Sequence, residues 1–254
     1  MRILLTNDDG INAPGLAALA DEMSGHGEVI IYAPVSEMSA VGHAITLSDP
    51  LRVVEFHKNG RLFGHAVRGT PADCVKIATW VLNRQDRKPD ILISGINLGS
   101  NTGINTIYSG TVSAATEGAI FGIPAIAISL ASFTSRDFSV AAQFAPVVAR
   151  HLLANPLPPG VFLNVNVPAV PKEAVQGIAI TRQGFTNYIE EYEVRRDPHD
   201  REYYWLTGEK MEVETNSDID DRAIIENRIS ITPIQLDLTC YPALSQLRNW
   251  RITF

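Results

Sequence analysis

The segment ILLTNDDGINAPG, residues 3–15, begins with a short apolar run and continues into two adjacent aspartates, Asp8 and Asp9, followed by glycine and proline. A short apolar run that ends at turn residues is typical of a buried strand in a parallel sheet. A helix-like pattern follows, from about Gly15 to Ser24, and Gly25 and Gly27 end it. The segment therefore predicts an α/β fold whose first strand ends on two carboxylates.

The first half of the chain repeats this alternation of strand and helix. Further strands are predicted at residues 29–33, 91–94 and 123–129, and further helices at residues 71–83 and from about 111 to 118–122. Residues 51–67 read as a hairpin around the turn pair Asn59-Gly60. We therefore expect residues 1–130 to form a Rossmann-like core with a doubly wound, mostly parallel sheet.

Residues 131–254 are expected to form a C-terminal extension of added strands rather than more βαβ units. The pattern predicts a helix at residues 139–153, strands in VFLNVNVP and GIAIT, a hairpin arm at about 187–207, a final strand in RISITPIQLDL and a terminal helix. In the arm we expect one aromatic side with Tyr192, Tyr203 and Trp205, and one charged side. Exposed aromatics and strand edges favour pairing between subunits, so the arm predicts an oligomer.

Composition excludes several classes of protein. A formal net charge of -7 argues against binding of a nucleic-acid duplex, because such binding depends on a basic surface. The chain has neither a secretion-signal pattern nor an apolar stretch of about 20 residues, so we expect a cytoplasmic protein without a membrane segment. The two cysteines, Cys74 and Cys240, lie far apart within apolar patterns and are expected to be buried thiols.

Polar residues follow three of the predicted strands. Asp8 and Asp9 follow the first, Ser39 follows the second, and Asn97 ends the run PDILISGIN. Ligands of doubly wound sheets bind at the carboxyl ends of the strands, so these side chains face one crevice if the strands are neighbours. Four oxygen donors favour Mg²⁺ or Mn²⁺, with Ca²⁺ as an alternative in a crystal, over Zn²⁺.

Each of these residues also has a plainer interpretation. Asp-Asp-Gly, Ser39 and Asn97 are all ordinary turn residues, and only their joint placement favours a metal site. The segment GSNTGINTIYSGTVSAATEGA, residues 99–119, adds a loop rich in free amides that runs into a helix. We expect it to bind phosphate through Asn101, Ser109, Gly110 and Thr111. The spacing matches neither a Walker loop nor a dinucleotide fingerprint.

Five motifs follow one another along the chain: ILLTNDDGINAPG, SAVGHAITL, RGTPADCV, SGINLGSNTG and YSGTVSAATEGA. In this order and spacing they resemble the SurE family of survival-protein 5′-/3′-nucleotidases, and the resemblance weakens at residues 185–227. The resemblance implies a divalent-metal-dependent phosphomonoesterase that acts on nucleoside monophosphates and on short polyphosphate, and that forms a homodimer or homotetramer. It also implies that the metal ligands are Asp8, Asp9, Ser39 and Asn97.

The leading hypothesis is metal-assisted hydrolysis of a phosphomonoester, in which Asp8 and Asp9 anchor the ion. The sequence leaves open whether one of them also acts as base or nucleophile. His43 is a candidate general acid, and the alternative is a supporting or surface histidine. A receiver module is disfavoured because no acceptor aspartate follows the middle strand. A non-catalytic nucleotide or phosphate sensor that uses the same site remains the alternative function.

Overall fold

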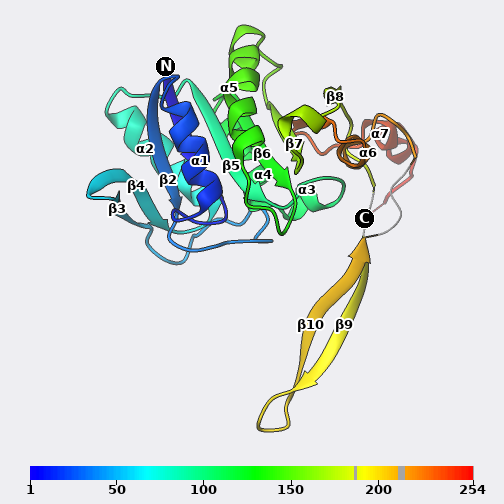
Figure 1. The fold of residues 1–254 in the computed structure, drawn as a ribbon. Helices are drawn as coiled ribbons and strands as arrows, with labels where there is room; N and C mark the ends of the chain where they lie inside the picture. The colour runs from blue at the N-terminus through cyan, green and yellow to red at the C-terminus, as the bar shows by residue number, and fades with distance from the viewer. Residues whose placement is uncertain (186–187, 211–214, 254) are drawn as a thin grey trace.

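The computed structural model describes residues 1–185, 188–210 and 215–253. Within these residues one mixed sheet forms the centre of the molecule (Figure 1). Its strands lie in the order β3 (Arg52–Lys58), β4 (Arg61–Arg68), β2 (Glu28–Pro34), β1 (Arg2–Thr6), β5 (Ile91–Leu98), β6 (Ala125–Ala131), β7 (Val161–Pro168), β11 (Ile229–Gln235) and β8 (Ile178–Ile180).

The first strand lies at the point where the strand order reverses. β1 pairs in parallel with β2 on one side and with β5 on the other, so that Leu5 is opposite both Ile31 and Ile93. The sheet then continues in parallel through β6 and β7. The predicted doubly wound α/β fold is therefore confirmed, and the strands that carry the polar residues are neighbours.

Helices cover both faces of this sheet. α1 (Pro14–Met23) and α5 (Ser139–Ala154) cover one face, and α2 (Pro71–Arg84) and α4 (Gly110–Ile120) cover the other. Alternate residues of β1 enter the two cores: Ile3 and Leu5 contact the first, and Leu4 contacts the second. Each of these fully buried side chains contributes about 1.5–3 kcal/mol to folding.

The prediction that no further βαβ unit follows residue 130 is wrong. β6 and β7 are parallel neighbours connected by α5, which buries Ala141, Ala145 and Val148 against the sheet face that α1 also covers. The added strands are β11, which is antiparallel to β7, and β8, which is parallel to β11. The sheet is continuous across residue 130, and the division of the chain at that residue stays a prediction.

Short helices complete the described part of the chain. They are α3 (Asn105–Tyr108), α6 (Asp220–Ile225), α7 (Tyr241–Arg248) and a 3₁₀ turn at Lys172–Ala174. α3 lies inside the segment that the sequence predicted as a long loop. The predicted hairpin at residues 51–67 is formed by β3 and β4, and its turn residues Asn59 and Gly60 both have positive φ angles, of 53° and 74°.

The hairpin arm consists of β9 (Tyr188–Arg196) and β10 (Glu202–Lys210), and it extends away from the sheet (Figure 1). Its expected first residue, 187, lies outside the described residues. The prediction of one aromatic side is wrong. Tyr203 is opposite Arg195, whereas Tyr192 is opposite Leu206. Because neighbouring residues of a strand point to opposite faces, Tyr192 lies on the other face from Tyr203 and Trp205.

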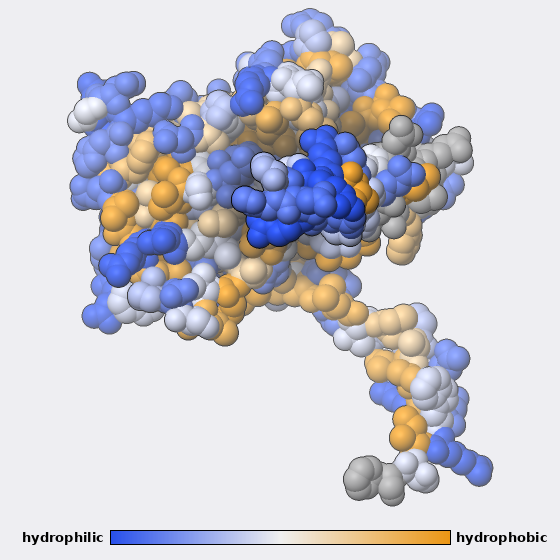
Figure 2. Space-filling view, turned by 90° about the horizontal axis from the view of Figure 1, so that it is seen from below, coloured by the Kyte–Doolittle hydropathy of each residue, from blue (hydrophilic) through white to orange (hydrophobic). Residues whose placement is uncertain are grey.

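The C-terminal segment also extends from the body, as Figure 2 shows from below. Leu238, Trp250 and Ile252 are exposed along it. Cys240 is exposed as well, at the start of α7, so the prediction of a buried thiol holds for Cys74 but is wrong for Cys240. Its neighbours Leu238 and Tyr241 are exposed and belong to neither of the two cores of the described residues. In the described ranges, no helix is both long and apolar enough to span a bilayer.

Candidate metal and phosphate site

The four predicted metal ligands line two adjoining cavities at the carboxyl ends of β1, β2 and β5. Asp8, Ser39 and Asn97 line a cavity of about 260 Å³, and Asp9 lines a second of about 350 Å³. Ser39 lines both. The fold therefore brings all four side chains to one region, as the strand-end pattern predicts.

Asp8 is buried and is held by the start of α4. The backbone N–H of Thr111 donates to Asp8 Oδ2 over 3.0 Å, and the Thr111 hydroxyl donates to Asp8 Oδ1. A Cβ on Gly110 would lie only 2.8 Å from the Cβ of Asp8, so glycine permits this close approach of helix and strand. Burial raises the pKa of Asp8, while the two hydrogen bonds from Thr111 lower it.

Asp9 lies beside Asp8 and accepts fewer hydrogen bonds than Asp8 does. Its Oδ2 accepts one long hydrogen bond of 3.3 Å from the backbone N–H of Leu98. Burial, and secondly the charge of Asp8, raise the pKa of Asp9 to about 7. Glu37 adds a third negative charge that raises the pKa of both aspartates, and it was not singled out from the sequence. This concentration of negative charge becomes favourable when a cation is present.

The neutral donors complete a set that fits a hard cation. Asn97 Nδ2 donates to the Gly99 carbonyl over 2.8 Å, which leaves Asn97 Oδ1 without a hydrogen bond from the described residues. Ser39 Oγ donates to Glu37 Oε1 over 2.7 Å and keeps its lone pairs. The proposed set has only two carboxylates, and within the described ranges no group of three or more histidine, cysteine, aspartate or glutamate side chains is placed to hold a metal. Two carboxylates with two neutral oxygen donors fit Mg²⁺ or Mn²⁺ better than Zn²⁺.

Among the predicted phosphate-binding residues, Asn101 and Ser109 line the same cavity as Asp8. Ser109 caps α4, because its Oγ accepts a hydrogen bond of 3.1 Å from the N–H of Val112. Both donors of Thr111 already bond Asp8 in this structure. Contact of Ser109, Gly110 and Thr111 with a phosphate stays a prediction, and the observed geometry gives Thr111 the task of orienting Asp8.

Asn101 is fixed by a buried amide network from the neighbouring strands. Asn166 Oδ1 accepts from the Asn101 N–H over 2.8 Å, and Asn164 Nδ2 donates to the Asn101 carbonyl over 2.8 Å. The Asn101 side chain donates to Ser129 Oγ over 2.8 Å. Sequence reasoning missed Asn164 and Asn166. The signal that could have identified them is the pair of alternating asparagines within the otherwise apolar strand VFLNVNVP.

The segment that carries Ser39, residues 36–49, is called the strap here. It runs from β2 across the starts of α4 and α2, and backbone bonds hold it at two points. The N–H of Met38 donates to the Asp8 carbonyl over 2.8 Å, and the N–H of Gly42 donates to the Tyr108 carbonyl over 2.9 Å. Ser39 therefore lies between two fixed positions of the backbone.

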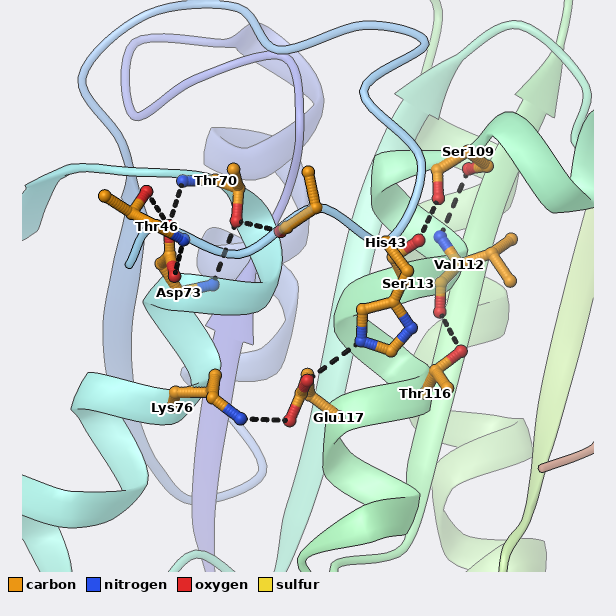
Figure 3. Close-up of polar contacts among 11 residues, drawn as sticks. His43, Thr46, Thr70, Asp73, Lys76, Ser109, Val112, Ser113, Thr116 and Glu117 are labelled. Atoms are coloured by element: carbon orange, nitrogen blue, oxygen red, sulfur yellow. Dashed lines mark hydrogen bonds and ion pairs between the residues drawn. The ribbon is translucent and has the colours of Figure 1, made fainter. Parts of the chain in front are cut away.

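Two carboxylates, one from each helix, hold the rest of the strap (Figure 3). Asp73 of α2 accepts from the Thr46 N–H over 3.0 Å and from the Thr46 hydroxyl over 2.6 Å, and also caps its own helix through the Thr70 N–H. Burial raises the pKa of Asp73, but these hydrogen bonds outweigh burial and leave the pKa below its ordinary value. Asp73 thus holds the strap as a carboxylate.

Glu117 of α4 is the second carboxylate, and it is only 3% exposed. Its Oε1 lies 2.8 Å from His43 Nε2, and its Oε2 lies 3.4 Å from Lys76 Nζ (Figure 3). His43 thus points toward Glu117, and it is not among the residues that line the two cavities beside the aspartates. This geometry favours the supporting role of His43 over the general-acid role, a choice that the sequence left open.

The strap predicts the effect of two substitutions. Glu117→Gln and His43→Ala should each raise the Mn²⁺ concentration needed for half-maximal activity by about 10-fold, because indirect support of a metal ligand contributes about 10- to 100-fold to affinity. The loss of activity should be equal for AMP and for p-nitrophenyl phosphate, which has a better leaving group. If His43→Ala lost activity on AMP alone, His43 would instead be identified as the general acid.

Comparisons with known proteins identify the family of this chain. The family model described as "Survival protein SurE" matches residues 3–190. The "5'-nucleotidase SurE" of Syntrophobacter fumaroxidans is 48% identical over 252 residues, which cover 99% of this chain and 100% of that protein. The "5'-nucleotidase SurE" of Syntrophus aciditrophicus is 51% identical and covers 98% of this chain and 93% of its own.

A solved structure agrees with the fold. The crystal structure of the SurE protein from Aquifex aeolicus aligns with a TM-score of 0.84 at 35% identity, over 98% of each chain. All of these comparisons indicate the same family. The chain belongs to the SurE survival-protein family.

Proposed function

We propose that this chain is a metal-dependent 5′-nucleotidase that hydrolyses nucleoside 5′-monophosphates to nucleoside and phosphate. The observation that carries this proposal is the pair of adjacent carboxylates at the switch point, one of them with a pKa raised to about 7, beside neutral oxygen donors and an open cavity. The printed names of the full-length relatives support the same activity.

In this mechanism Asp8, Asp9, Ser39 and Asn97 would hold one divalent ion, which would supply Lewis-acid activation of the phosphate and of water. Thr111 keeps Asp8 oriented through its two hydrogen bonds. Asn101, Ser109 and Gly110 line or adjoin the position for the phosphate. Whether Asp8 or Asp9 also acts as base or nucleophile, beside its role as a ligand, stays open.

Activity on nucleoside 3′-monophosphates and on short polyphosphate is supported only by the family resemblance. The alternative is a sensor that binds nucleotide at the same site without turnover. Measurement of phosphate released from 5′-AMP by the purified chain with Mn²⁺ tests the proposal. Steady release is expected. Binding of AMP without release would favour the sensor, and 3′-AMP in a parallel assay tests the second specificity.

We also propose that the protein is a homodimer or homotetramer in which the hairpin arm contacts another subunit. An isolated two-stranded hairpin is marginally stable in water, yet β9 and β10 pair only with each other among the described strands. Tyr192 with Leu206 on one face, and Trp205 on the other, leave apolar side chains exposed. A partner surface that covers these side chains would stabilise the arm.

Deletion of residues 188–207 is therefore expected to lower the molecular mass of the assembly, as measured by light scattering at micromolar concentration. The predicted metal ligands all precede residue 101, so the shortened protein should still bind Mn²⁺. An unchanged assembly after deletion, or a monomeric full-length protein, would contradict this role of the arm.

A cytoplasmic location is proposed as well. Cys74 and Cys240 are both free thiols, which is typical of a reducing compartment.

A further inference from the structure

Two largely exposed aromatic side chains lie beside the proposed site. Phe133, in the loop after β6, is 71% exposed and lines both the cavity of Asp8 and the cavity of Asp9. Tyr108, at the end of α3, is 54% exposed and lines the cavity of Asp8 as well. More than half of each side chain is exposed in the described part of the chain, and both lie next to the residues proposed to hold the metal and the phosphate.

The ring of Phe133 contacts the backbone at the end of β5. Gly99, directly after β5, has a φ of 119°, and a Cβ built there would lie 2.7 Å from Phe133 Cε1. The ring therefore rests against the bare backbone at the end of the strand that carries Asn97. The loop itself is held by Ser132 Oγ, which accepts from the N–H of Thr134 over 3.1 Å and of Ser135 over 2.9 Å.

An exposed ring in this position is suited to stacking. One side of the Phe133 ring lies against the backbone of Gly99, and the side chain lines both cavities while 71% of it stays exposed. Apart from the guanidinium of Arg136, the other polar groups of the two cavities are negatively charged or neutral. These polar groups suit a metal, a phosphate or a sugar but offer little to an apolar, planar group. A nucleobase is planar and attached to the phosphate through one sugar, so it matches both the ring and the neighbouring site.

We propose that Phe133 forms the stacking surface for the base of the nucleotide, with Tyr108 as a second aromatic contact, and that this pair distinguishes nucleotides from other phosphomonoesters. The proposal rests on the proposed nucleotidase function. Because every base has a stacking face, Phe133 selects for the presence of a base rather than for one particular base.

Equilibrium dialysis with labelled adenosine tests the stacking without any need for turnover. Phe133→Ala is expected to weaken adenosine binding by about 5- to 100-fold, and Phe133→Trp is expected to retain it, because tryptophan also offers a stacking face. Trp80→Ala is the matched control: Trp80 is an exposed aromatic of α2 that contacts Arg84 and lies outside both cavities. It should leave binding unchanged.

Kinetics with two substrates give a second readout. Phe133→Ala should raise KM for AMP by a similar factor and leave KM for ribose 5-phosphate, which has no base, unchanged. An unaltered affinity for adenosine, or equal changes for both substrates, would overturn the proposal. A lower assembly mass with unaltered adenosine affinity would also overturn it and assign Phe133 to a subunit interface. If the unsubstituted protein released phosphate from neither substrate, the nucleotidase proposal would fail, while dialysis would still decide the stacking.

Discussion

Asp9→Asn is expected to reduce metal-dependent release of phosphate from AMP by more than about 100-fold. Loss of indirect support for a metal ligand costs about 10- to 100-fold, so the loss of a charged ligand should cost more. The remaining carboxylate, Asp8, already accepts two hydrogen bonds from Thr111 and cannot replace the missing charge. Phosphate release should be measured at saturating Mn²⁺, with Asp21→Asn on the exposed side of α1 as the matched control.

The same substitution should stabilise the metal-free protein. Asp9 has a pKa of about 7 in the fold against an ordinary value of 3.8, so the folded state binds more protons between these values. Stability of the metal-free wild type therefore falls as pH rises from about 4 to 7, because the ionised carboxylate is disfavoured in the fold. Because asparagine cannot ionise, the metal-free variant at pH 8 should have a Tm a few degrees above that of the metal-free wild type. Each kcal/mol of added stability raises Tm by about 2–4 °C.

Thermal melting with and without Mn²⁺ separates the two effects. Mn²⁺ should raise the Tm of the wild type and of Asp21→Asn, but not that of Asp9→Asn. If Asp9→Asn kept full activity, or if it melted below the metal-free wild type at pH 8, the assignment of Asp9 as a metal ligand in a charge-crowded site would be wrong.

Removal of the metal is expected to abolish activity altogether. After treatment with a chelator and its removal, phosphate release from AMP should fall to background, and Mg²⁺ or Mn²⁺ should restore it. The reason is that the donors around Asp8 and Asp9 are all oxygen atoms, which prefer hard cations. The concentration of Mn²⁺ needed should decrease as pH rises through about 7, because Asp9 must lose its proton to bind the ion.

Restoration of activity by Zn²⁺ tests whether all the metal ligands are oxygen atoms. Activity restored by Zn²⁺ alone would indicate nitrogen or sulfur ligands and would contradict the all-oxygen site. Activity that survives chelation would remove the metal from the mechanism.

The sequence was sufficient to predict that four polar side chains lie in one region of the fold, because the signals for it are local. Asp8, Asp9, Ser39 and Asn97 each follow or end an apolar strand, and the parallel arrangement of β2, β1 and β5 brings their ends to one edge of the sheet. The first turns of α2 and α4 could also be predicted from local signals, namely the N-cap residues Thr70 and Ser109.

The parts that sequence reasoning missed depend on contacts between distant segments. Glu117 looks like one charged residue in a helix of small side chains, and its role follows only from the approach of His43 and Lys76. The face of Tyr192 in the arm depends on the register between β9 and β10, which composition does not reveal. The further crossover through α5 was missed because charged and aromatic residues after it suggested a change of architecture.

The location of bound Mn²⁺ in crystals of the metal-loaded protein, by anomalous scattering, tests the central claim most directly. The account predicts one ion at the carboxyl ends of β1, β2 and β5, within about 2.5 Å of oxygen atoms of Asp8, Asp9, Ser39 and Asn97. Crystals of Asp9→Asn grown with the same Mn²⁺ should lack this peak. An ion bound elsewhere, or the absence of any anomalous peak beside Asp8 and Asp9 in the wild type, would contradict the account.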